Sequence, residues 1–147
     1  MQVGDRLPPL IRTLDLPRLV AYAGATWDWH PVHFDPATAV RFNLPAPVVD
    51  GQMLGALLAE QSLDWAGSQA FVRKMAFRIR SMAFAGECVR CDSEVVSVTR
   101  VGAVRVVTLR QRVTVAERVI IDDASLDLHV GGIVSGPPAR EGAILRD

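Results

Sequence analysis

The chain has 147 residues, half of them hydrophobic, and its 16 basic and 16 acidic side chains cancel to a formal net charge of zero. This composition predicts one globular domain with a real core and excludes a disordered chain. The charge balance gives no indication of a nucleic-acid partner or a membrane-surface partner. We see no secretory signal peptide and no apolar run long enough to span a bilayer, so we expect a cytoplasmic location.

The first half of the chain predicts helices and loops. Residues 7–14 fit a short leading strand or an extended segment. Asp15 is a typical N-cap for a helix over residues 16–26, and Asp35 is a second such cap for a short helix that follows it. The segment 51–67 is apolar around much of its circumference, which predicts a largely buried helix.

After residue 67 the pattern changes to period two, which predicts strands. Residues 71–84 alternate, with one face apolar except for Arg73 and the other basic: Phe71, Met75, Phe77 and Ile79 against Lys74, Arg78 and Arg80. Three more strands are predicted over residues 88–98, 103–115 and 118–130. Four long consecutive strands favour an antiparallel sheet with one face covered by the buried helix.

Cys88 and Cys91 are the only cysteines of the chain. They lie three residues apart in a predicted strand, so their side chains should point to opposite faces. We therefore expect two structural thiols with no disulfide and no shared metal. This cysteine usage also agrees with a cytoplasmic location.

The predicted elements form a single domain over residues 1–132, followed by a flexible Gly/Pro-rich tail over residues 133–147. The class is α+β. One strand before the buried helix and the others after it resembles the hotdog fold, in which an antiparallel sheet wraps around a long central helix.

The chemistry of the chain gathers in the segment TWDWHPVHFD, residues 26–35. It holds two carboxylates and two of the three histidines of the chain: Asp28, His30, His33 and Asp35. A carboxylate and an imidazole on one loop can hold and activate a water molecule. The same four groups could supply nitrogen and oxygen ligands to a metal. The segment could also be only a polar turn, with Asp28 capping the loop and His33 in the core.

The order Asp28-Trp29-His30-Pro31-Val32-His33-Phe34-Asp35 resembles the D-x-N-P-x-H-x-D motif of the MaoC-like (R-specific enoyl-CoA hydratase) family, which has the hotdog fold. The similarity covers roughly residues 5–130. It includes Ala39, Phe42 and the segment Val49-Asp50-Gly51-Gln52-Met53. A weaker match is Phe84-Ala85-Gly86-Glu87, which is similar to a Pro-Gly-Asp turn of the family.

The resemblance implies a hydro-lyase that reversibly hydrates a trans-2-enoyl-CoA to a 3-hydroxyacyl-CoA in fatty acid or lipid metabolism. It implies that Asp28 and His33 are the catalytic pair and that the Gly51 N–H is the oxyanion donor. A helix-terminal N–H suits that role because the helix dipole favours negative charge there. The resemblance also implies that the family motif binds no metal, so we expect neither a metal nor a cofactor.

The sequence departs from the family pattern at three positions near the expected substrate. Trp27 replaces the usual glycine, His30 the usual asparagine, and Asp50 a frequent histidine. All three are candidate substrate-binding residues. Each also has a structural interpretation: His30 supports the loop, Asp50 caps the helix, and Trp27, like Trp29, packs against the loop or a dimer partner.

The expected partner is an acyl-CoA thioester, with neither a nucleic acid nor a membrane. The resemblance implies a dimer joined sheet edge to sheet edge, and a higher oligomer or a heteromer stays open. Two other functions also stay open: a hotdog acyl-CoA thioesterase and a non-catalytic subunit of a heteromeric hydratase. Strand arginines are expected to form a solvated face, and one or two could meet coenzyme A phosphates: Arg73, Arg78, Arg80, Arg90, Arg110 and Arg112.

Overall fold

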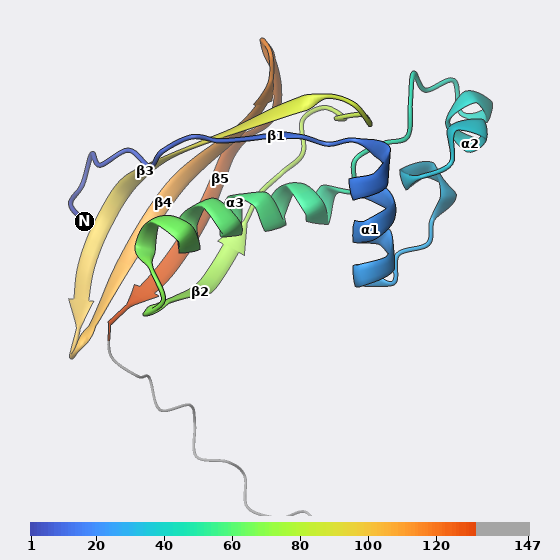
Figure 1. The fold of residues 1–147 in the computed structure, drawn as a ribbon. Helices are drawn as coiled ribbons and strands as arrows, with labels where there is room; N and C mark the ends of the chain where they lie inside the picture. Colours follow the sequence, from blue (N-terminus) through green and yellow to red (C-terminus); the bar gives the residue numbers. More distant parts are fainter. Residues whose placement is uncertain (132–147) are drawn as a thin grey trace, which may run out of the picture.

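The computed structural model describes residues 1–131 as one five-stranded antiparallel sheet curled around a central helix (Figure 1). The strand order is β1-β3-β4-β5-β2. The elements in chain order are β1 (Leu10–Thr13), α1 (Leu16–Thr26), the 3₁₀ helix η1 (Pro31–His33), α2 (Pro36–Arg41), α3 (Gly51–Ala66), β2 (Ala70–Ala76), β3 (Cys88–Val101), β4 (Val104–Val115) and β5 (Arg118–Val130). The predicted hotdog arrangement is confirmed.

The central helix α3 lies along the inner face of the sheet, as the apolar pattern of the sequence predicts (Figure 1). Leu54 and Leu58 are 1% and 0% exposed and belong to a buried cluster with Val113 and Ile121 of the sheet. Leu19 brings α1 into the same cluster. Each fully buried leucine contributes about 1.5–3 kcal/mol to folding, so this packing holds α3 against the sheet.

A buried polar network holds α3 against the middle of the sheet. The Gln61 side chain donates to the Cys91 carbonyl at 3.0 Å and accepts from the Ser93 hydroxyl at 2.7 Å. Gln111 of β4 donates to the hydroxyls of Ser93 and Ser62 at 2.9 and 3.0 Å. Such hydrogen bonds in a core favour one helix register over its neighbours, and the one oxygen of this network without a partner in residues 1–131 is Gln111 Oε1. The sequence reasoning did not anticipate this network.

The strand predicted over residues 71–84 is too long. Strand β2 ends at Ala76, where regular pairing with β5 stops, and the chain then packs against α3. Phe77 and Ile79 sit so close to the two small residues of that helix that a Cβ at Gly55 or at Gly51 would collide with them. The alternating apolar residues after Ala76 therefore pack on the helix, and only Ile79 still pairs with the sheet, through an isolated bridge to Ile121 of β5.

The predicted facing of β2 is also wrong at its start. Phe71 is 66% exposed, whereas Val72 and Met75 point to the core. A bulge immediately after Val72 shifts the register, so one extra residue separates two inward side chains. That residue is Arg73, which is exposed and is therefore no exception on an apolar face.

The predicted caps are confirmed, since the Asp15 side chain accepts from the Arg18 N–H and Asp35 accepts from the N–H groups of Ala37 and Thr38. Both cysteines are free, with Cys88 exposed and Cys91 buried. Burial raises the pKa of the Cys91 thiol to about 12, which keeps it protonated and unreactive. The predicted tail, residues 133–147, lies outside the described residues. None of the helices within residues 1–131 is long and apolar enough to cross a membrane.

Candidate active site

The loop after α1 is shaped by its own side chains. Trp27 ends the helix with φ 60°, the left-handed conformation that favours glycine. The Asp28 carboxylate then accepts from the His30 N–H at 3.2 Å, and the His30 ring accepts from the Val32 N–H at 3.3 Å. These local bonds turn the chain into η1, which ends at His33. The short segment thereby turns Asp28 and His33 toward one another.

His33 is held in a defined orientation. Its Nδ1 lies 2.8 Å from the Val48 carbonyl oxygen. Because a carbonyl can only accept, Nδ1 carries the hydrogen and donates it, which leaves Nε2 with a free lone pair in the neutral ring. The backbone fixes the same contact, since the Val48 N–H donates to the Val32 carbonyl at 2.9 Å. His33 is therefore presented as a base at Nε2.

The start of α3 forms the second wall of the site. One oxygen of Asp50, Oδ1, accepts from the Gln52 N–H at 2.8 Å and so caps the helix. Within residues 1–131, no hydrogen bond uses the Gly51 N–H. This donor stands in the first turn, where the helix dipole favours a negatively charged partner.

The loop before α3 rests on the turn over residues 84–87. The Val49 N–H donates to the Ala83 carbonyl and the Ala85 N–H to the Pro47 carbonyl, both at 2.8 Å. Gly86 has φ +90°, which a side chain would strain, so glycine suits this turn. The weaker sequence motif, residues 84–87, thus supports the loop before α3 and does not line the cleft.

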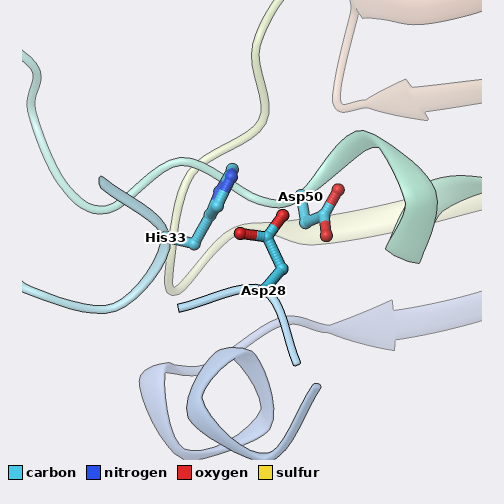
Figure 2. A group of neighbouring side chains, drawn as sticks. All are labelled: Asp28, His33 and Asp50. Atoms are coloured by element: carbon cyan, nitrogen blue, oxygen red, sulfur yellow. The ribbon is translucent and has the colours of Figure 1, made fainter. Parts of the chain in front are cut away.

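Figure 2 shows Asp28, His33 and Asp50 gathered into one group, with the Asp28 carboxylate between the other two side chains in this view. One ligand atom from each lies within 4.8 Å of the others. The three residues line a narrow cleft whose other walls are apolar or aromatic: Leu19, Tyr22, Ala23 and Met53. Two carboxylates and an imidazole gathered in this way can move protons to and from a bound molecule.

Tyr22 was missed by the sequence reasoning. It is the only tyrosine of the chain, and it lies on α1 one turn before the loop. Burial raises the pKa of its hydroxyl, and the negative charge of Asp50 raises that pKa further. Its protonated hydroxyl is thus a polar group at the edge of an otherwise apolar wall. The available signal was the spacing Leu19–Tyr22–Ala23, which places the tyrosine on the inward stripe of α1.

The other residues singled out from the sequence lie around the cleft rather than in it. Trp27 is 81% exposed and makes an edge-to-face contact with Trp29 at 6.0 Å between ring centres. His30 is exposed, with its ring 6.0 Å from the ring of His33. Both oxygens of Asp35 bond to its own helix, so Asp35 is a cap and not a member of the group. For Trp27 and His30, substrate contact stays a prediction.

The strand arginines lie at the surface, as predicted. All six are exposed, and two of them pair with nearby carboxylates: Arg90 with Asp92 and Arg112 with Asp122. Contact with coenzyme A phosphates stays a prediction.

The sequence matches the family model of the MaoC like domain over residues 7–117, which is more than half of the chain. The chain belongs to the MaoC-like domain family. This MaoC-like chain has no match among the curated proteins.

Several solved structures have the same fold. The ChsH1-ChsH2 complex from Mycobacterium tuberculosis is similar with a TM-score of 0.79 and 25% identity, over 88% of this chain and 98% of that one. The (R)-hydratase from A. caviae involved in PHA biosynthesis has a TM-score of 0.79 and 20% identity, over 88% and 97% of the two chains. R-hydratase PhaJ1 from Pseudomonas aeruginosa has a TM-score of 0.77 and 19% identity, over 97% and 94%.

Proposed function

We propose that this MaoC-like protein is a hydro-lyase that reversibly adds water across the double bond of a trans-2-enoyl thioester. The family assignment supports a hydratase or dehydratase role at the coarser level. The observation that carries the finer proposal is that Asp28 and His33 line one cleft, with a ring nitrogen of His33 within 4.8 Å of an Asp28 carboxylate oxygen. The Asp28 carboxylate and His33 Nε2 together hold one water molecule next to the substrate Cβ.

In the hydration direction, this pair removes a proton from the water as its oxygen bonds to Cβ. The electrons of the double bond move toward the thioester carbonyl, whose oxygen becomes enolate-like. A proton then returns from the pair to Cα, which gives the 3-hydroxyacyl thioester. Water is the only second reactant, and no electrons are gained or lost.

The developing oxyanion needs a donor that is in place before the reaction. The Gly51 N–H meets this need, because it has no acceptor in residues 1–131 and stands at the positive end of α3. Gly51 itself carries no side chain beside this N–H, and the place that a Cβ would take lies against Cδ1 of Ile79. Asp50 lines the cleft with Asp28 and His33, and we assign it to substrate contact as well as to the helix cap.

The proposed substrate carries coenzyme A, and the proposed assembly is a homodimer or a higher oligomer. The edge strand β2 supports the dimer, because it ends the sheet and exposes Phe71 to 66%. Two similar structures are described as complexes: ChsH1-ChsH2 and the HadBC 3R-hydroxyacyl-ACP dehydratase of Mycobacterium tuberculosis. A heteromer and an acyl-carrier-protein substrate are therefore included in the test.

The test is the loss of enoyl-thioester absorbance over a panel of chain lengths and of branched or cyclic acyl groups, on both carriers. We expect absorbance to fall with no release of free thiol. Release of thiol would replace the proposal with the thioesterase alternative. Failure of the chain alone, with activity restored by a second MaoC-like chain even after Asp28→Asn, would assign the non-catalytic subunit role.

A further inference from the structure

The second oxygen of Asp50, Oδ2, has no hydrogen-bond partner in the part of the chain that the structure describes. Asp50 is only 8% exposed, and Oδ1 is engaged by the helix cap. A carboxylate oxygen shielded from water without a partner is unfavourable by a few kcal/mol. Figure 2 shows Asp50 next to Asp28, and one Asp50 carboxylate oxygen lies within 4.8 Å of a ligand atom of each of Asp28 and His33.

No basic side chain forms an ion pair with the carboxylates of this group within residues 1–131. Asp28 and Asp50 have ligand atoms within 4.8 Å of one another, yet no ion pair within residues 1–131 involves either of them. Two carboxylates at this separation repel when both are charged. An added cation between them would offset the repulsion and satisfy the unpartnered oxygen at once.

We propose that Asp28, His33 and Asp50 bind one divalent transition-metal ion of the Zn²⁺ class. One imidazole nitrogen and two carboxylate oxygens leave a fourth tetrahedral position for water, which is the ligand number of open zinc sites. The hydrogen bond from His33 Nδ1 to the Val48 carbonyl leaves Nε2 as the nitrogen available to the ion, and a carbonyl acceptor of this kind is typical of zinc-bound histidine. Imidazole disfavours Mg²⁺, which prefers oxygen ligands and its own waters.

The distances require a modest closure of the group. Bonds of about 2.0–2.2 Å place the ligands of a tetrahedral zinc ion roughly 3.3–3.6 Å apart. The ligand atoms of the group lie within 4.8 Å of one another, so side-chain rotations that move them by about an ångström bring them to the distances that zinc requires. The ion then occupies the position assigned above to the reacting water and engages both members of the catalytic pair. Zn²⁺ is therefore an inhibitor of turnover, and this consequence alone rests on the proposed function.

The experiment titrates the untagged, metal-free full chain with Zn²⁺ in competition with a chromophoric chelator. The exposed Cys88 is first replaced by serine so that its thiol binds no zinc. We expect one ion per chain and binding weakened at least about tenfold by Asp50→Asn, which keeps a good helix cap. His33→Gln and Asp28→Asn should weaken binding in the same way. Co²⁺ should bind to the same three side chains with visible d–d absorption, and Mg²⁺ should not compete.

Matched controls are His30→Gln on the same loop and Asp64→Asn on the same helix, which should leave Zn²⁺ binding unchanged. Absence of saturable Zn²⁺ binding would overturn the inference. Equal Zn²⁺ affinity in the protein with all three residues intact and in folded variants of Asp50 and His33 would also overturn it. Hydratase activity without Zn²⁺ binding refutes this inference alone. Stoichiometric Zn²⁺ binding by a chain whose metal-free form has no hydratase activity refutes the proposed function and leaves the metal site standing.

Discussion

Replacing Gly51 by valine separates an oxyanion donor from an ordinary helix start. An added Cβ at this position would lie 2.4 Å from Cδ1 of Ile79. That atom is the far end of a side chain that is 45% exposed, so Ile79 can move aside. The φ angle of Gly51 is not among the positive values, so valine meets no backbone strain. We expect a stability loss of about 1–3 kcal/mol from overpacking, which leaves a folded protein.

The expected loss of turnover is larger, because the valine side chain stands in front of the donor N–H. Removing one oxyanion donor costs about 3–4 kcal/mol, or a hundredfold to a thousandfold in kcat. Gly55→Ala is the matched control, since its Cβ would lie 2.7 Å from the Phe77 ring in the buried part of the same helix. Gly55→Ala should lower the melting temperature and keep kcat per folded molecule. Normal turnover in folded Gly51→Val would refute the oxyanion assignment.

Three other predictions test the site. Asp28→Asn and His33→Gln should each lower the hydration rate at least about a hundredfold with unchanged circular dichroism, and near-normal turnover in either would exclude it from the pair. Dialysis against a strong chelator should not lower the rate; a loss restored by metal would reverse the metal-free assignment. Tyrosinate absorbance should give a Tyr22 midpoint above 10.0 that falls in Asp50→Asn, and an unshifted midpoint would contradict the contact. Because the raised pKa favours the protonated folded state, this stability contribution is present below about pH 10 and is lost as pH rises through the folded pKa.

Local signals in the sequence predicted the elements well. Asp15 and Asp35 are capping residues whose bonds involve only the next three residues, so spacing alone locates both helix starts. The predicted bounds of the strands over residues 103–115 and 118–130 agree with the structure to within one residue. Both strands have long alternating patterns and a neighbour on each side, which leaves little choice of where each strand begins and ends. The proposed catalytic pair was assigned through the family motif, and the structure places Asp28 and His33 on the same cleft.

What the sequence could not predict depends on contacts between distant segments. The bulge after Val72 and the departure of the chain from the sheet at Ala76 follow from packing against α3, which period-two alternation does not report. Asp50 enters the group from a segment 22 positions after Asp28, and either role, cap or site residue, fits its position in the sequence. The structure gives one carboxylate oxygen to the cap, and the other has no hydrogen-bond partner within residues 1–131.

The most direct test of the central claim follows the oxygen atom that the protein adds. A trans-2-enoyl thioester is incubated with the wild-type protein in ¹⁸O-labelled water, and the product is analysed by mass spectrometry before and after thioester hydrolysis. The proposed hydration predicts one ¹⁸O atom at C3 of an intact 3-hydroxyacyl thioester, and incorporation at least about a hundredfold slower in Asp28→Asn or His33→Gln. Label in the carboxylate of a released acid, together with free thiol, would show attack at the carbonyl and contradict the account.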